Sequence, residues 1–206
     1  MLFHKHKILF IGIPKNASHG ILYALSNLTD RHHDHTSYIQ VYQEHDQELL
    51  DTYTSLAVVR NPYDRAYSCW NYLVQIEELE MKFNIHSFEE YIKALESKDH
   101  FNCTMLEEEL TMHELTYPQH KFITFKNHIL VDKVLRFEQL TQDWNDFKKE
   151  YNKTAQFKIT KDLKVHNSME YKERDWTKVY TPEMYTIVNE FYKKDFELFG
   201  YEMRTK

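Results

Sequence analysis

ILFIGIPKNASHGILYAL, residues 8–25, joins a short apolar run, a turn and an amphipathic segment. The run 8–13 is apolar on both faces, which is typical of a central parallel strand covered by helices on each side. Pro14 removes a backbone hydrogen-bond donor and ends the strand. The apolar residues of 21–25 have the spacing of a helix face that packs on a sheet. The stretch therefore predicts a buried strand, a tight turn and a helix.

The turn between this strand and helix has the features of an anion site. Ala17, Ser18 and Gly20 are small, so the backbone can come close to a ligand. The first N–H groups of a helix lack acceptors within the helix and lie at the positive end of its dipole, beside the charge of Lys15. Phosphate or sulfate is the natural ligand of such a turn. An ordinary strand-to-helix turn with a surface lysine is the alternative.

A second strand and helix repeat this design. Ser55–Val59 predicts a buried strand, and Pro62 suits the first turn of a helix that continues to about Ile76. Arg60 directly follows the strand, and open α/β sheets bind their ligands at the carboxyl ends of parallel strands. Ser68 lies further along the helix and is predicted to face the same crevice. The arginines of this segment could instead form ion pairs with nearby carboxylates, which suits Arg65 better than Arg60.

The rest of the chain alternates further helices with short strands. Helices are predicted over 87–95, where Ser87 and Glu90 form a capping box, and over 105–115, 140–151 and 181–200. Short strands are predicted over 38–42, 122–125 and 131–137, and a loop over 159–178. The pattern predicts a single α/β domain, residues 1–206, with a central parallel sheet flanked by helices.

Charge argues against one class of partner. The chain carries a formal charge of -6, whereas nucleic-acid binders generally need a basic excess to displace counterions. Nucleic acid is therefore not an expected partner.

Cysteine content and hydropathy favour a cytoplasmic protein without a membrane segment. Cys69 and Cys103 are too few and too far apart in sequence for a disulfide framework or a zinc site, which indicates reduced thiols. No apolar run approaches the roughly 20 residues that span a bilayer, and the first strand begins too near Met1 to leave room for a signal peptide. Asp30–His35 holds three histidines, but their spacing does not suit a metal site, and none is expected.

Taken together, the motifs resemble those of the carbohydrate (type 2) sulfotransferase family, which uses 3′-phosphoadenylyl sulfate (PAPS) as donor. Residues 13–18, IPKNAS, are similar to that family's 5′-phosphosulfate loop, and residues 59–68, VRNPYDRAYS, match its 3′-phosphate motif. Residues 117–119, 131–140 and 180–201 fit later parts of the family pattern. The resemblance covers nearly the whole chain and implies a P-loop-NTPase-like three-layer fold.

The resemblance also implies roles for individual residues. Lys15 is expected to neutralise charge on the leaving phosphate, helped by backbone N–H groups, while Arg60 and Ser68 hold the 3′-phosphate. The family has hydroxyl residues where His19 and Gly20 stand, so side-chain donors to the 5′-phosphosulfate are missing there. The expected donor-binding set is Pro14, Lys15, Asn16, Ala17, Ser18, His19, Gly20, Arg60, Ser68, Asn167 and Ser168.

The acceptor hydroxyl of a sulfuryl transfer needs a general base, and histidine is the side chain best suited to that role near neutral pH. The family places a histidine between its two phosphate motifs. His35 fits that position best, with His33 and His45 as rivals. The expected reaction is in-line sulfuryl transfer from PAPS to a hydroxyl of a glycan or other small acceptor, without a metal.

Two other functions stay open at this point. A nucleoside-triphosphate kinase would share the strand–loop–helix layout, but the chain has no Gly-x-x-x-x-Gly-Lys-[Ser/Thr] motif. A non-catalytic nucleotide- or glycan-binding protein of the same fold is the second alternative, which the changes at His19 and Gly20 permit.

Overall fold

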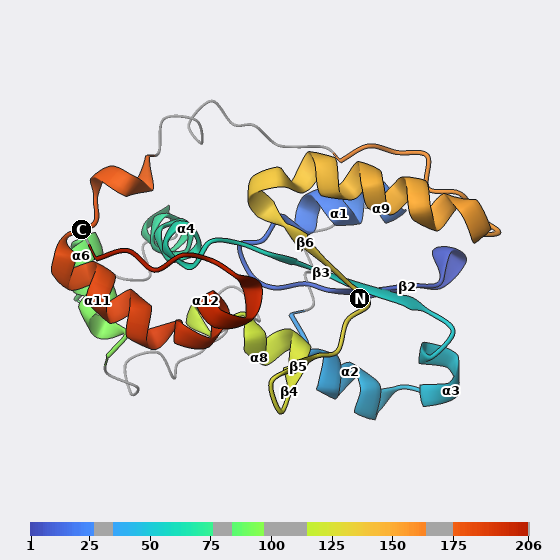
Figure 1. The fold of residues 1–206 in the computed structure, drawn as a ribbon, viewed down its shortest axis with the longest axis horizontal. Helices are drawn as coiled ribbons and strands as arrows, with labels where there is room; N and C mark the ends of the chain where they lie inside the picture. Colours follow the sequence, from blue (N-terminus) through green and yellow to red (C-terminus); the bar gives the residue numbers. More distant parts are fainter. Residues whose placement is uncertain (27–34, 76–83, 97–114, 164–174, 206) are drawn as a thin grey trace. The chain divides into compact units, whose positions relative to one another are not determined.

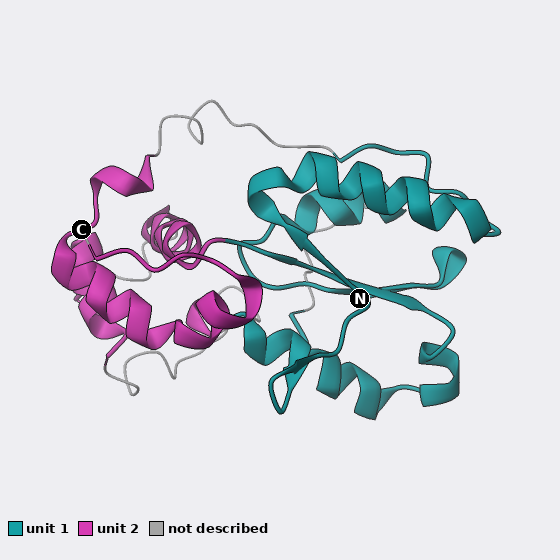
Figure 2. Cartoon of the chain, in the orientation of Figure 1, with its two compact units in different colours: residues 1–60, 119–166 teal, residues 61–118, 167–206 magenta. Residues whose placement is uncertain are grey.

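The computed structural model describes residues 1–26, 35–75, 84–96, 115–163 and 175–205 (Figure 1). The chain divides into two compact units, each built from two separate segments (Figure 2). Unit 1 comprises residues 1–60 and 119–166, and unit 2 comprises residues 61–118 and 167–206. The single domain expected over residues 1–206 stays a prediction.

Unit 1 contains a four-stranded sheet with the strand order β1-β2-β3-β6. The short strand β1 (Leu2–Phe3) is antiparallel to β2 (Ile8–Ile11). β2, β3 (Thr54–Val59) and β6 (Lys133–Arg136) run parallel to one another. The central sheet of mostly parallel strands is therefore confirmed, although β6 is shorter than the predicted strand 131–137.

Helices cover both faces of this sheet (Figure 1). One face packs against α1 (Ser18–Ser26) and α9 (Leu140–Thr154), which share a hydrophobic core with the strands. Trp144 and Phe147 of α9 are buried in that core. The other face carries α2 (Tyr38–Glu44), α3 (Gln47–Leu50) and α8 (His120–Ile123).

The prediction of a strand over Tyr38–Tyr42 is wrong, because this segment forms α2. A complete capping box starts the helix: Gln40 N donates to Ser37 Oγ at 3.4 Å, and Ser37 N donates to Gln40 Oε1 at 3.1 Å. These two bonds satisfy backbone donors that a helix start otherwise leaves without partners. The local cap therefore outweighs the alternating pattern that suggested a strand.

The predicted strand Phe122–Phe125 is wrong in its first half. Phe122 and Ile123 belong to α8, and only Thr124–Phe125 is extended, as β4. β4 pairs with β5 (His128–Ile129) in a separate two-stranded hairpin. The two turn residues have φ of 48° and 67°, as the tight turns of two-residue hairpins require.

Unit 2 is helical. Its elements are α4 (Pro62–Gln75), α6 (Phe88–Ala94), the short 3-10 helix η3 (Trp176–Lys178), α11 (Pro182–Phe191) and α12 (Lys193–Phe199). The apolar stripe predicted as one helix over 181–200 is divided between α11 and α12, because Tyr192 leaves helical geometry with a φ of -103° and a ψ of 20°. Gly200, with a φ of 65°, ends α12 where the sequence predicted the end.

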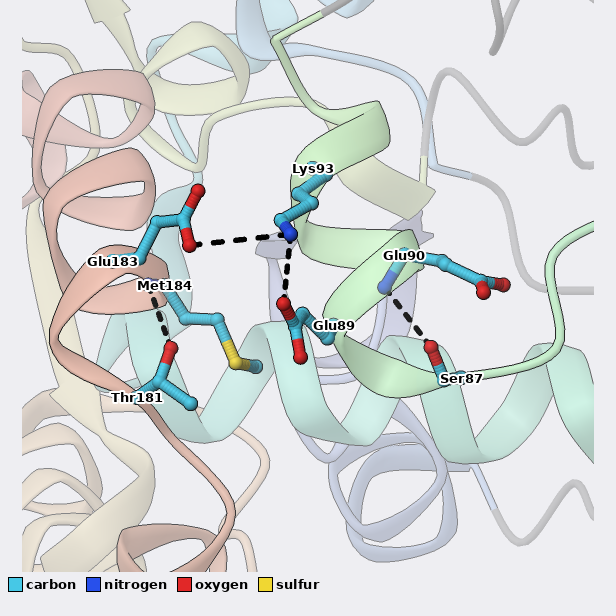
Figure 3. A network of polar contacts seen from close by, with 7 residues as sticks. All are labelled: Ser87, Glu89, Glu90, Lys93, Thr181, Glu183 and Met184. Carbon is cyan, nitrogen blue, oxygen red and sulfur yellow. Dashed lines mark hydrogen bonds and ion pairs between the residues drawn. The ribbon is translucent and has the colours of Figure 1, made fainter.

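Polar contacts cap α6 and α11 and connect the two helices on their exposed side (Figure 3). Glu90 N donates to Ser87 Oγ at 3.2 Å, so Ser87 caps α6, but the predicted capping box is incomplete because Glu90 Oε2 accepts from His86 N at 2.7 Å in place of Ser87 N. Met184 N donates to Thr181 Oγ1 at 3.3 Å, which caps α11. Lys93 of α6 contacts Glu89 at 2.7 Å and Glu183 of α11 at 3.9 Å. Solvent screens exposed pairs of this kind, so the buried apolar side chains hold the two helices together.

Some predictions fall outside the described residues. These are nearly all of the helix expected over 105–115 and much of the loop expected over 159–178, including Asn167 and Ser168. No helix in the described ranges is long and apolar enough to cross a membrane.

Candidate functional site

The register of the parallel strands brings two loops to the same edge of the sheet. Ile11 is paired with Ala57, and Val59 is paired with Arg136, so β2, β3 and β6 end close together. The loop 12–17 follows β2, and Arg60 follows β3. Carboxyl ends of parallel strands are the usual ligand-binding edge of such sheets.

The loop after β2 has an unusual backbone. Lys15 and Ala17 adopt φ values of 66° and 60°, although neither is glycine. A non-glycine residue in this left-handed region costs about 1–2 kcal/mol. Asn16, between these two residues, does not have a positive φ. Backbone that alternates in this way between left-handed and other conformations turns successive N–H groups towards one side, where they can form an anion-binding concavity. Asn16 N itself closes a turn to Ile13 O at 3.3 Å.

Ser18, the first residue of α1, carries a buried hydroxyl. Within the described residues Ser18 Oγ has no hydrogen-bond partner. Buried polar atoms nearly always have one, and an orphaned group costs about 1–3 kcal/mol. Because a hydroxyl can donate to an anion, Ser18 fits a phosphate or sulfate at this loop. Asn16 Oδ1 likewise has no partner in the described part of the chain, but as an acceptor it does not suit an anion.

His19 and Gly20 complete the first turn of α1. The side chain of His19 is exposed, and Gly20 N donates to Ala17 O at 3.0 Å. Neither residue supplies the hydroxyl that the family pattern has there. Ser18 is therefore the hydroxyl nearest to the strained loop in sequence.

Arg60 lies against the same loop. Its side chain is 2% exposed, and Nη1 donates to Lys15 O at 3.0 Å. The guanidinium carbon lies 3.9 Å from the ring centroid of Phe137, the residue after β6. A guanidinium stacked on an aromatic ring is both held in place and kept charged. The structure thus brings the basic residues of both motifs together, and Phe137 is a contributor that sequence reasoning missed.

Gln119 is a second residue that sequence reasoning missed. Its side chain is fully buried, and Oε1 accepts from Asn16 Nδ2 at 2.7 Å and from Arg60 N at 2.9 Å. Nε2 donates to Arg60 O at 2.8 Å. The only signal in the sequence was the place of Gln119 in the Tyr-Pro-Gln stretch of the resemblance.

His35 precedes α2 and contacts Gly12, the first residue of the loop after β2. Its Nδ1 is 2.5 Å from Gly12 O, which can only accept a hydrogen bond. Nδ1 therefore carries the proton, and in the neutral ring Nε2 carries the lone pair. Of its rivals, His45 is exposed at the end of α2, and His33 lies outside the described residues.

The other expected site residues are placed as follows. Ser68 lies on α4 in unit 2 and is 8% exposed. Arg65, also in unit 2, donates to the carbonyls of Leu115 and Tyr117 at 3.0 Å each, which gives it a structural role there. Lys15, Ser18, His35 and Arg60 thus gather at the carboxyl edge of the unit 1 sheet.

The sequence model of one protein family, described as the sulfotransferase family, matches residues 1–202. The chain belongs to the sulfotransferase family. The resemblance drawn from the motifs is thereby confirmed, and the family membership makes sulfuryl transfer the general activity of this domain. Neither the curated proteins nor the solved structures gave a match.

The candidate site of this sulfotransferase offers cationic and hydrogen-bonding groups. Among the residues that the structure describes, no group of three or more His, Cys, Asp or Glu side chains could hold a metal ion. The strained loop, the Ser18 hydroxyl and the buried Arg60 charge all favour an anionic ligand.

Proposed function

We propose that this sulfotransferase transfers the sulfuryl group of PAPS to a hydroxyl of a glycan or another small hydroxylated acceptor. The observation that carries the proposal is the loop around Lys15 and Ala17, whose two positive φ values precede the buried Ser18 hydroxyl, which has no hydrogen-bond partner among the described residues. Strain of this kind persists where it serves a binding function. The same layout of strand, loop and helix supports a P-loop-like fold for unit 1.

Lys15 and Ser18 are assigned to the 5′-phosphosulfate group. The half-buried Lys15 provides a positive charge, and the N–H groups at the start of α1 add the positive end of the helix dipole. In the transfer step the bond between sulfur and the 5′-phosphate oxygen breaks, and negative charge grows on that oxygen. Fixed positive groups stabilise such charge without reorganising, which is the largest contribution that a protein makes to this type of transfer.

Arg60 is assigned to the 3′-phosphate, which distinguishes PAPS from ATP. Its guanidinium is permanently charged and is fixed by the Lys15 carbonyl and the Phe137 ring. The resemblance assigns Ser68 to the same phosphate and assigns Asn167 and Ser168 to closure over the nucleotide. These three assignments stay predictions from the sequence.

His35 is assigned as the general base. As the hydroxyl oxygen of the acceptor forms a bond to sulfur, the hydroxyl proton passes to Nε2 of His35. The hydrogen bond from Nδ1 to the Gly12 carbonyl holds the tautomer that this step needs. A second role of that hydrogen bond is to stabilise the imidazolium that results.

The family match covers segments of both units, which supports the proposal that residues 1–206 act as one sulfotransferase domain. The test is incubation with radiolabelled PAPS and a panel of neutral glycans, acidic glycans and small phenols or alcohols. We expect label in at least one acceptor class with the wild-type protein and none with Lys15→Ala. Selective binding of adenosine 3′,5′-bisphosphate without any transfer would instead favour the non-catalytic binding protein.

A further inference from the structure

We propose that Gln119 is a positioning residue that couples the 5′-phosphosulfate loop to the 3′-phosphate arginine. This inference rests on the proposed function, because it assigns a role within the proposed donor site. Gln119 belongs to neither phosphate motif, and it reaches both of them from the segment before α8.

The contacts form a closed ring within unit 1. Gln119 Oε1 accepts from the Asn16 side chain and from Arg60 N, at 2.7 and 2.9 Å, while Nε2 donates to Arg60 O at 2.8 Å. Arg60 Nη1 then donates to Lys15 O at 3.0 Å, and the peptide bond from Lys15 to Asn16 closes the ring. One amide therefore fixes the Arg60 backbone and the loop that carries Lys15 together.

The type of side chain matters for this ring. An amide both donates and accepts, so a single planar group can bind the N–H and the C=O of Arg60 and still accept from Asn16. A carboxylate would lose the donor, and a thioether would lose all three bonds. Only glutamine combines both functions with this length of side chain.

Gln119 acts at a distance from the donor. Its side chain is 0% exposed, so it cannot touch a bound nucleotide. Its effect has to pass through the Arg60 backbone, which it holds directly after β3, and through the Asn16 side chain in the loop after β2. Because misplacement of fixed charges by about 1 Å is costly in such sites, the property that depends on Gln119 is recognition of the 3′-phosphate by Arg60.

The experiment measures the Kd of adenosine 3′,5′-bisphosphate and of adenosine 5′-monophosphate by isothermal titration calorimetry. The Kd of the monophosphate divided by the Kd of the bisphosphate gives a ratio that reports the contribution of the 3′-phosphate to binding. We expect Gln119→Met to reduce this ratio about tenfold or more, equivalent to about 1.4 kcal/mol. Gln119→Asn keeps the amide on a shorter side chain and should reduce the ratio less than Gln119→Met. If Gln119→Met does not fold, Gln119→Asn is the variant that tests the proposal.

Unit 1 offers a matched control. Asn152 on α9 holds the backbone of Ile159 in the same way: Nδ2 donates to Ile159 O and Oδ1 accepts from Ile159 N, at 2.8 Å each. Asn152→Leu removes a comparable clamp away from the phosphate loops. We expect it to lower the unfolding temperature while leaving the ratio of Kd values unchanged.

The outcomes separate the two proposals. If the wild-type protein does not prefer the bisphosphate, the assignment of the donor fails and the role of Gln119 fails with it. If the wild-type protein prefers the bisphosphate and folded Gln119→Met or Gln119→Asn keeps the same ratio, the role of Gln119 alone is overturned. A ratio that falls equally in Asn152→Leu would also overturn it, because the loss would then follow stability and not position.

Discussion

Arg60 Nη1 donates a hydrogen bond of 3.0 Å to the carbonyl oxygen of Lys15. The guanidinium of one phosphate motif thus holds the backbone of the other, at the residue whose φ is 66°. A carbonyl fixed by a buried cation keeps the neighbouring N–H groups turned to the other side of the chain. The strained conformation of the loop and the position of Arg60 therefore depend on each other.

Replacement of Lys15 by glycine tests the effect of the Lys15 charge on turnover without disturbing the positive φ of the loop. Glycine adopts positive φ without cost, so we expect Lys15→Gly to fold with a free energy of unfolding close to that of the wild type. Because the charge beside the leaving oxygen is lost, turnover should fall about 100-fold to 1000-fold. Lys5→Ala is the matched control, since Lys5 is exposed and lies before the amino end of β2. Equal turnover of Lys15→Gly and wild type would contradict the assignment.

Replacement of Ser18 by alanine separates stability from ligand binding. Without ligand, we expect Ser18→Ala to be as stable as the wild type or more stable, because the substitution removes a buried hydroxyl that has no partner in the described residues. With ligand, the Kd of adenosine 3′,5′-bisphosphate should rise about 10-fold to 100-fold, since a hydrogen bond to a charged group contributes about 1.5–3 kcal/mol.

Ser26→Ala is the control for this substitution. Ser26 lies at the other end of α1, and its Oγ donates to Leu22 O at 2.7 Å. The Ser26→Ala variant should leave the Kd of adenosine 3′,5′-bisphosphate unchanged. A loss of stability in Ser18→Ala with an unchanged Kd would show that the hydroxyl has a structural partner and not a ligand.

Replacement of His35 by asparagine removes the base and keeps the hydrogen bond. The Asn side-chain amide can donate to Gly12 O as Nδ1 does, but it offers no group that accepts a proton near neutral pH. We expect nucleotide binding to be retained while turnover falls about 100-fold to 10,000-fold. His45→Asn is the parallel variant and should be fully active. Loss of turnover in His45→Asn, with His35→Asn active, would transfer the role of base to His45.

Three tyrosines of unit 2, of which Tyr91 and Tyr192 are buried and Tyr180 is half-buried, make the free energy of unfolding depend on pH in the alkaline range. Burial raises the pKa of Tyr91, Tyr180 and Tyr192 above the ordinary value of 10.0. Above pH 10.0 the unfolded chain loses these protons and the folded chain keeps them, so the free energy of unfolding should fall, by up to about 1.4 kcal/mol per pH unit for each tyrosine. Below that pH the contribution is fully present.

Tyr192→Phe tests this dependence. The variant loses the hydrogen bond of 2.8 Å from Tyr192 Oη to Thr116 O, so it should be less stable at neutral pH by about 1 kcal/mol. Its loss of stability between about pH 8 and about pH 11, measured by urea unfolding, should be smaller than that of the wild type. Equal losses would show that Tyr192 does not stay protonated in the folded protein.

The sequence predicted those parts of the fold that local patterns determine. Apolar runs located β2 and β3, and Pro62 and Thr181 marked the beginnings of α4 and α11. The error at Tyr38–Tyr42 was avoidable, because Ser37 and Gln40 already had the spacing of a capping box. The break between α11 and α12 could not be predicted in this way. It occurs at Tyr192, which is buried and whose hydroxyl donates to Thr116 O, 76 residues away in the sequence.

The site was predictable in its charges but not in its geometry. Lys15 and Arg60 stood out because they follow apolar strands. The positive φ at Lys15 and Ala17 had no signal, since neither residue is glycine. The resemblance marked the stretch that contains Gln119 but not the role proposed for it, because its partners lie 103 and 59 residues away and are reached only in the folded protein.

The most direct test of the central claim compares adenosine 3′,5′-bisphosphate with ADP as ligands of the wild-type protein. Both carry two phosphates, but only the first has one at the 3′ position that Arg60 is proposed to bind. Saturating bisphosphate, at about 100 times its Kd, should stabilise the folded state by about 2.7 kcal/mol and raise the unfolding temperature. ADP at the same concentration should have a much smaller effect, and Arg60→Ala should remove the difference. Equal stabilisation by the two nucleotides would contradict the claim that this is a PAPS-dependent sulfotransferase.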